Sequence, residues 1–395
     1  MSVRRVFAVC GVFALVLAGC DGPAPPRGGE STTVAAPASR PDWQSLTLPA
    51  PPGGAGRAVV RDAASCAGRW FVAGGVVDAQ GGTRPAAWTS VDGTTWTVVE
   101  VRADSFYGRQ NVFLSVACRD GKAALIGAKV GGAHGYPRVS TWRQVADGAL
   151  VEVQASFETY GGPTAVNVSR LAAGPPGWLI VGNRSAGAAS WVSSPAAAEF
   201  ALVEGAPELA SDAVGVTWAF DAVATSSGWL AVGGLLPAGR IDRDPAVWSS
   251  PDGRSWRRTV LPGGSEYEEL QRVVLADGVP VAVGLRGGTF GAWRQEAAGW
   301  VAVGAFGRRA GAGVPGVGSL VSSGGRLVAA VTDGARHSVW VSADRGGSWR
   351  EATMPLDVPA GADRDVTLVA VGDRLWLAAD DGTRAGLWWA AGPGA

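Results

Sequence analysis

Side chains suited to ligand recognition are sparse in this sequence, and most of them fall in one stretch. The 395 residues include four tyrosines and two histidines. The stretch combines tyrosine, histidine and arginine at Tyr107, Arg109, His134, Tyr136, Arg138 and Tyr160. Aromatic rings beside guanidinium groups suit sugars or acidic groups, through stacking and paired hydrogen bonds. We therefore expect a binding site here; the alternative is that these residues pack within long loops.

Other site chemistry finds little support in the sequence. The histidines and cysteines are not clustered at ligand spacing, so we expect no metal site and no cofactor. The glycine-rich residues 311–318 do not stand between a strand and a helix, which excludes a phosphate loop. Asp92, Asp252 and Asp344 each stand in an Asp/Gly turn, and we interpret them as structural rather than catalytic.

Those turns belong to a repeat that organises the chain. The sequence WSSPDGRSW at 248–256 recurs at 88–96 and, with one extra residue, at 340–349. Weaker copies begin at Trp142, Trp191, Trp293 and Trp388. Asp-Gly between two apolar runs favours a tight hairpin turn, because glycine accepts positive φ. Seven copies at similar spacing indicate a repeat architecture.

Apolar runs upstream of each tryptophan supply further strands. In the first unit these runs are residues 59–64 and 71–74, and the other units follow the same order. Each unit of 45–57 residues thus holds four antiparallel strands, which we name A to D. No stretch shows a sustained helical period. The sequence predicts an all-β protein, a seven-bladed β-propeller over residues 42–395.

The two ends of the predicted ring complete each other. The last unit stops after Trp389 in a Gly/Pro tail and lacks strand D. Residues 43–49 precede the first unit and resemble the D strands at 256–262 and 349–355. We expect this N-terminal segment to complete the last blade, because an open sheet edge would otherwise invite association.

Residues 342–349 (SADRGGSW) resemble the Asp box, Ser-x-Asp-x-Gly-x-x-Trp, of bacterial neuraminidase-type repeats. The turns at Asp92 and Asp252 resemble it with one residue deleted. The resemblance covers the repeats and implies turns between the third and fourth strands of propeller blades. Sialidases with such boxes use an arginine triad, a Tyr–Glu pair and an acidic Asp on six blades. This chain lacks their Phe/Tyr-Arg-Ile-Pro motif, and its turn motif carries no activity by itself.

The two faces of a propeller differ in their connections. The D–A and B–C connections share one face, here called the loop face; the A–B and C–D turns share the other, the turn face. The six candidate binding residues fall in connections on the loop face of blades two and three, where binding usually resides. The acidic residues 266–269 are a second candidate, at blade five.

Two cysteines fall at equivalent places in neighbouring blades. Cys66 and Cys118 both stand near the end of an A strand, just before the A–B turn. A disulfide between them requires Cα atoms within about 7 Å. We expect the disulfide to form, with two free thiols as the alternative.

The first 41 residues indicate export. Arg4 and Arg5 precede an apolar run at 6–17 that is too short to span a bilayer comfortably. Residues 17–20 (LAGC) resemble the bacterial lipobox, which implies that residues 1–19 are a signal peptide and that lipid is attached to Cys20. Ordinary cleavage with an unmodified Cys20 is the alternative. Residues 20–41 have the composition of a disordered tether.

Charge and composition narrow the possible partners. Removing residues 1–19 leaves 32 basic residues, two fewer than the full chain's 34, against 34 acidic ones. Near-neutral charge argues against nucleic acid. We predict a monomeric binding or assembly module on the outer face of the cytoplasmic membrane or cell envelope, with a glycan or an envelope protein as ligand. The alternatives are a scaffold for another envelope protein and a sialidase-like or other propeller glycoside hydrolase, which needs two carboxyl groups about 5–10 Å apart.

Replacing the lipobox cysteine tests the anchor. The change Cys20→Ser should release the protein from membrane fractions or leave it unprocessed, because the lipid attaches to the thiol. Metabolic labelling with a fatty-acid analogue measures the modification. Equal labelling of the variant and the unchanged protein would contradict the lipobox interpretation.

Overall fold

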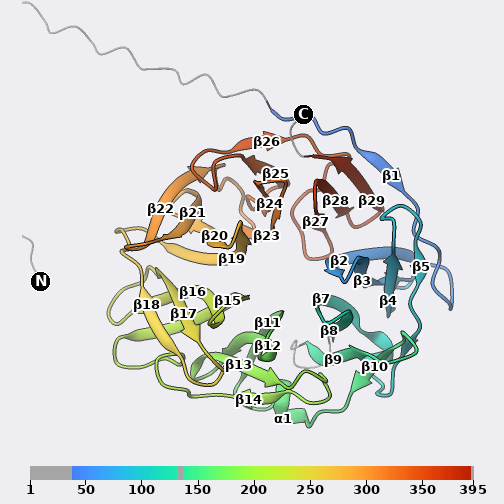
Figure 1. Cartoon of the computed structure of the whole chain (residues 1–395), viewed down its shortest axis with the longest axis horizontal. Coiled ribbons are helices and arrows are strands. Elements are labelled where there is room, and N and C mark those ends of the chain that lie inside the picture. Colours follow the sequence, from blue (N-terminus) through green and yellow to red (C-terminus); the bar gives the residue numbers. More distant parts are fainter. Residues whose placement is uncertain (1–37, 132–136, 393–395) are drawn as a thin grey trace, which may run out of the picture. The chain divides into compact units, whose positions relative to one another are not determined.

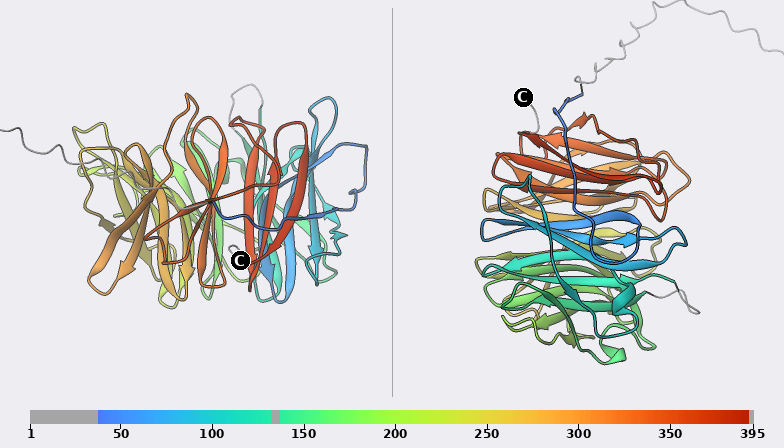
Figure 2. Two further views of the ribbon diagram at one scale, coloured as in Figure 1. Left: turned by 90° about the horizontal axis from the view of Figure 1, so that it is seen from above. Right: turned by 90° about the vertical axis from the view of Figure 1, so that its right-hand side faces the viewer.

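Seven β-sheets form a ring in the computed structural model, which describes residues 38–131 and 137–392 (Figure 1). This confirms the predicted seven-bladed β-propeller. Strand A of each blade lies innermost, and the connections project from both faces of the ring (Figure 2). In the described ranges, no helix has the length and apolar character needed to cross a membrane.

Blades one to six follow the chain in order. Blade one comprises β2 (Arg57–Cys66), β3 (Arg69–Val77), β4 (Thr83–Ser90) and β5 (Thr97–Val98). Blade two comprises β7 (Val112–Arg119), β8 (Lys122–Lys129), β9 (Arg138–Gln144) and β10 (Leu150–Val153), with β6 (Val101–Arg102) added parallel to β10. Blade three comprises β11 (Ala165–Gly174), β12 (Gly177–Arg184), β13 (Gly187–Ser193) and β14 (Ala201–Val203). Blade four comprises β15 (Gly215–Thr225), β16 (Gly228–Pro237), β17 (Asp244–Ser250) and β18 (Arg257–Val260).

Blade five comprises β19 (Glu268–Ala276), β20 (Val279–Arg286), β21 (Thr289–Glu296) and β22 (Gly299–Phe306). Blade six comprises β23 (Gly316–Ser323), β24 (Arg326–Thr332), β25 (His337–Ser342) and β26 (Arg350–Ala352). Blade seven comprises β27 (Asp365–Val371), β28 (Arg374–Asp380), β29 (Ala385–Ala391) and the N-terminal β1 (Gln44–Leu46). The described helices are a 3-10 turn, η1 (Gly108–Gln110), and one short helix, α1 (Phe157–Tyr160).

The N-terminal strand closes the ring as predicted. Strand β1 pairs antiparallel with β29, with Ser45 opposite Trp388 (Figure 1). Leu46 and Leu48 pack against the apolar cluster shared by blades seven and one, and the indole of Trp43 donates a hydrogen bond to the Thr353 carbonyl, 2.8 Å away. The closing segment therefore contributes both backbone pairing and apolar burial.

A β-bulge recurs in the innermost strands. The A strands of blades one to six each contain a register shift at their middle, and the strand of blade three contains a second one nearer its start. A polar residue directly follows each of the six middle shifts. Those residues are Asp62, Ser115, Arg170, Asp221, Arg272 and Ser319. A bulge bends a strand and re-aims a side chain. Here each of these polar side chains contacts the next blade, and we name this set the inner belt.

The inner belt joins blades through side-chain bonds to backbone. The Asp62 carboxylate accepts a bond from the Val116 amide, 2.8 Å away, and the Asp221 carboxylate accepts one from Val273 at 3.1 Å. The hydroxyls of Ser115 and Ser319 likewise accept from Leu171 and Leu368, both at 3.2 Å. Each bond satisfies an N–H on the innermost strand of the next blade, which is the edge strand of its sheet.

Charges complete the inner belt. The Arg170 guanidinium lies 3.2 Å from the Asp62 carboxylate and 3.9 Å from that of Asp221, so it bridges blades one and four. Burial alone would lower the Arg170 pKa, but the two carboxylates outweigh burial and raise it. Burial raises the pKa of Asp221 and lowers that of Arg272 to about 10. Removing one member would leave a partner charged and unpaired, which is the costly case.

The three aspartate turns seal gaps between blades on the turn face. An added Cβ at Gly93 would meet the Trp376 ring of blade seven at 2.4 Å, and the Trp376 indole donates to the Gly93 carbonyl at 3.0 Å. Gly253 lies in the same way against Val192 of blade three, and Gly346 against Ala292 of blade five. Glycine is required here because a side chain would push the blades apart.

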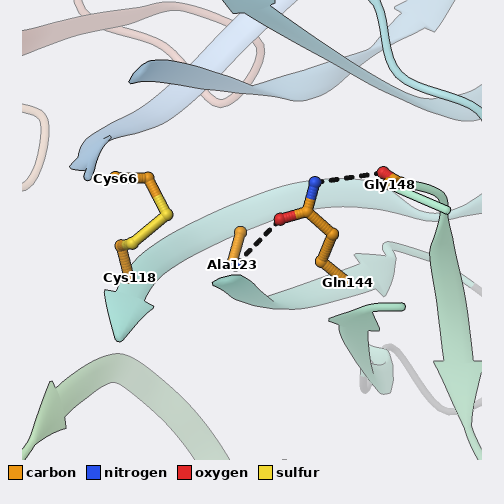
Figure 3. The surroundings of a disulfide bond; sticks show 5 residues. All are labelled: Cys66, Cys118, Ala123, Gln144 and Gly148. Carbon is orange, nitrogen blue, oxygen red and sulfur yellow. Dashed lines mark hydrogen bonds between the residues drawn. A yellow bond between two sulfur atoms is a disulfide. The ribbon is translucent and has the colours of Figure 1, made fainter. Parts of the chain in front are cut away.

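Blades one and two are joined differently. A disulfide links Cys66 to Cys118, with the Cα atoms 5.2 Å apart (Figure 3). In the C–D turn of blade two, the Asp147 carboxylate accepts from the Ala149 amide at 3.0 Å. The Gln144 side chain also braces this turn, by accepting from Ala123 and donating to Gly148. A cavity of about 570 Å³ lies in this gap, between the two blades.

Deleting the closing strand tests its contribution. Removing residues 42–49 should lower the free energy of unfolding by on the order of 5 kcal/mol, because three large apolar side chains lose their burial. Removing residues 21–36, the matched control from the predicted tether, should change it little. Urea titration measures both. Equal losses from the two deletions would contradict closure by β1.

Candidate functional site

Two adjoining cavities lie on the loop face between blades two and three. The first, here the polar cleft, has a volume of about 340 Å³ and is lined by Ser105, Tyr107, Ser140, Glu152 and Gln154 among others. The second, here the apolar pocket, has a volume of about 410 Å³ and is lined mainly by Leu114, Ile126, Val139, Val166 and Val168. They share Pro137, Arg138, Val139, Phe157, Tyr160 and Gly161.

Some of the predicted binding residues line these cavities. Tyr107 and Arg138 both line the polar cleft. Arg109, in η1, lines neither cavity and donates a hydrogen bond to the Asp104 carbonyl, 2.9 Å away. His134 and Tyr136 lie outside the described residues. The structure therefore brings together Tyr107 and Arg138, with Tyr160 beneath them.

Tyr160 forms the floor of both cavities. Its side chain is 9% exposed, and its hydroxyl donates to the Thr141 hydroxyl at 3.1 Å. Burial raises the pKa of Tyr160, so the phenol stays protonated at neutral pH. Tyr160 is thus a packed residue that shapes the site from below.

Arg138 lies between two exposed aromatic rings. Its guanidinium carbon is 5.6 Å from the centre of the Tyr107 ring and 5.3 Å from that of Phe157. Tyr107 comes from the link that enters blade two, and Phe157 from α1, which enters blade three. A cation held over aromatic faces keeps its charge and a fixed direction. Arg138 is positioned to present its N–H donors at the boundary between polar cleft and apolar pocket.

Glu152 holds the loop that carries Tyr107. Its carboxylate accepts hydrogen bonds from the amides of Asp104 and Ser105 at 2.9 and 2.8 Å. It also accepts from the hydroxyls of Ser105 and Ser140 at 2.7 and 2.8 Å. Burial raises the Glu152 pKa, but these donors outweigh burial and hold it below the ordinary value. Glu152 is an ionised acceptor whose lone pairs are used.

Phe157 and Glu152 were not anticipated from the sequence. The predicted site consisted of tyrosine, histidine and arginine residues, and Phe157 is a phenylalanine three residues before Tyr160. The available signal was an aromatic residue in a connection: Phe157 is 59% exposed, where a solvent-facing loop would favour polar residues.

The three aspartates of the turn face act within their own turns. The Asp92 carboxylate accepts from the amides of Thr95 and Thr94, at 2.6 and 2.8 Å, and these bonds lower its pKa. Asp252 and Asp344 accept equivalent bonds from Ser255 and Ser348. These contacts are those of turn-forming residues. Within the described ranges, no group of three or more His, Cys, Asp or Glu side chains could hold a metal ion.

At the acidic candidate site of blade five, the polar side chains form hydrogen bonds with one another. The Tyr267 hydroxyl donates to the Glu269 carboxylate at 2.7 Å, and Arg243 donates to both, at 3.0 and 2.7 Å. Burial raises the Tyr267 pKa, and the charge of Glu269 adds to that rise. Neither residue lines the polar cleft or the apolar pocket.

Exposed apolar side chains gather on the loop face. Twelve large ones are exposed among the described residues. Nine stand in D–A or B–C connections or near the start of an A strand: Phe106, Tyr107, Leu114, Val130, Phe157, Val214, Val216, Ile241 and Val314. On the turn face there is Val91, and on the outer strands Val260 and Val301. Eight of the nine belong to connections or strands of blades two to four, and three of these, Tyr107, Leu114 and Phe157, line the two cavities.

Comparison with known proteins identifies the fold. No protein-family model and no curated protein matches the sequence. A puromycin hydrolase structure is 14% identical, with a TM-score of 0.52 over 84% of this chain and 51% of that one. The β-propeller domain of the Trilobed protease from Pyrococcus furiosus is 8% identical, with a TM-score of 0.47 over 84% and 93%. A Trypanosoma rangeli sialidase, in complex with the inhibitor DANA, is 12% identical, with a TM-score of 0.39 over 89% and 57%. At these identities the likeness is one of fold alone.

Replacing Glu152 tests its role as a brace. The change Glu152→Gln should cost about 1 kcal/mol of unfolding free energy at pH 7, because charged hydrogen bonds are lost. A carboxylate with a lowered folded-state pKa stabilises above its ordinary value of 4.5, and that contribution disappears as pH falls through the folded-state pKa. The difference between the variant and the unchanged protein should therefore shrink below about pH 4.5. Urea titration at several pH values measures it, with the exposed Glu158→Gln as control; a difference independent of pH would contradict the role.

Proposed function

We propose that this protein is an exported, lipid-anchored binding module whose loop face docks another protein of the cell envelope. The observation that carries the proposal is the gathering of nine of the twelve exposed large apolar side chains on that face. Exposed apolar side chains concentrated on one face favour a protein–protein contact site, because most monomeric domains expose little apolar surface in one place. The predicted lipid on Cys20 and the tether at 20–41 would hold the ring near the membrane with freedom to meet a partner.

A protein ligand suits the site better than a glycan. The apolar pocket offers mainly aliphatic side chains, and sugar hydroxyls placed there would lose their hydrogen bonds to water without replacement. An apolar side chain of a partner gains from the same burial. The aromatic rings at the rim are also residue types enriched at protein interfaces.

The site does not supply the protonated carboxyl group that a glycoside hydrolase needs. Glycoside hydrolysis requires two opposed carboxyl groups, one of them protonated. Glu152 is the one carboxylate among the residues that line the two cavities, and its lowered pKa keeps it ionised at neutral pH. The Tyr267–Glu269 pair resembles a nucleophile pair in composition, but its raised Tyr267 pKa opposes ionisation of the phenol. We therefore favour binding over catalysis.

Face-selective crosslinking tests the proposal. A photo-crosslinking amino acid placed at Val216 on the loop face should yield a discrete protein adduct in intact producing cells. The same amino acid at Val91 on the turn face, also an exposed valine, is the matched control and should yield none. Gel mobility and mass spectrometry measure the adducts. Equal adducts from both positions, or none from Val216, would contradict docking through the loop face.

A further inference from the structure

We propose that the docked partner inserts an apolar side chain into the apolar pocket and places an adjacent carboxylate on Arg138. This inference rests on the proposed function and adds the chemistry of the segment that is recognised. Three features of the site carry it: the charge of Arg138, which has no carboxylate partner among the described residues, the occupied lone pairs of Glu152, and the boundary that the two cavities share.

The first feature is the state of the Arg138 guanidinium. The two aromatic rings direct it, and among residues 38–131 and 137–392 it has no carboxylate partner. Two arginines at the equivalent place in other blades have carboxylate partners: Arg243 pairs with Glu269 at 2.7 Å, and Arg336 with Glu351 at 2.8 Å. A planar guanidinium with free N–H donors matches a carboxylate with two hydrogen bonds.

The second feature explains why the neighbouring acid leaves Arg138 free. Glu152 lines the same cleft, but four donors from Asp104, Ser105 and Ser140 use its oxygens. A carboxylate offers about four lone-pair sites. The acid therefore fixes the Tyr107 loop, which in turn directs Arg138, and an incoming carboxylate would supply the acceptor that the site lacks.

The third feature is the geometry shared by the two cavities. Arg138 and Phe157 line both of them, so an apolar group in the apolar pocket would carry its neighbouring polar group to Arg138. A pocket of about 410 Å³ exceeds the volume of any single side chain, which leaves room for Leu, Met or Phe to enter. The recognised segment thus has a large apolar residue next to Asp, Glu or a chain-terminal carboxylate.

Peptide selection with matched variants tests this chemistry. A random heptapeptide library displayed on phage is selected on the purified protein, and the enriched peptides are synthesised with either the carboxylate or its amide. We expect enriched peptides to place an apolar residue beside an acidic one.

Variants of the site test which groups the peptides contact. The change Arg138→Met should weaken binding about tenfold or more, and amidation of the peptide should weaken it equally. Combining the two changes should weaken binding little further than either change alone. Filling the apolar pocket by Ala165→Leu should also weaken binding. Arg138→Lys, which keeps the charge without the planar fork, should recover part of the loss.

The control is Arg308→Met, because Arg308 is an exposed arginine on the loop face of blade six, away from the cavities. It should leave affinity within about twofold. Selected peptides whose affinity falls with Val216→Asp but is unchanged by Arg138→Met would overturn this inference. Such peptides would still bind the loop face, so the proposed function would stand. Preference for a fluorescent long-chain fatty acid or an acidic trisaccharide over every peptide would overturn both. Unchanged melting temperatures of the Arg138 variants would confirm that lost binding is not lost folding.

Discussion

The fold depends on joining the innermost strands across every gap, because adjacent blades are separate sheets and share no backbone ladder. The inner belt supplies those joints at six of the seven gaps, and the Thr367 hydroxyl joins blades seven and one by donating to the Arg61 carbonyl at 2.7 Å. Bulges in six A strands turn polar side chains toward the next blade, where Asp62 and Asp221 accept amide protons and Arg170 bridges both. In a low-dielectric interior such bonds are strong when complete and costly when broken. They fix the positions from which all loops emerge.

The two faces of the ring have different roles. On the turn face, aspartate turns and a disulfide seal or staple the gaps, so the side chains there serve stability. On the loop face the connections are longer, and the side chains at blades two and three leave two cavities between them. Glu152 converts part of this loop face into a fixed site, since it pins the loop that carries Tyr107. Rigid scaffold and variable loops are a common division for binding proteins.

The sequence predicted what local pattern can encode. Repeated Trp hairpins gave the blade number, and the likeness of residues 43–49 to other D strands gave the closure. The inner belt was missed because its partners are 46 to 108 residues apart in the sequence, and no local spacing marks them. Arg138 and Tyr107 were anticipated as neighbours because their loops belong to one face. Phe157 and Glu152 depend on how two links fold over each other, which the periodicity of strands does not describe.

The most direct test of the account is oxidative footprinting of the protein where it works. Hydroxyl radicals generated on intact producing cells, and on the purified protein, modify exposed side chains in proportion to their accessibility. We expect Phe106, Tyr107 and Phe157 to be protected in cells relative to the purified protein, and Val91 on the turn face to be modified equally in both. Equal modification of the three loop-face aromatics in both samples would contradict a loop face occupied by a partner.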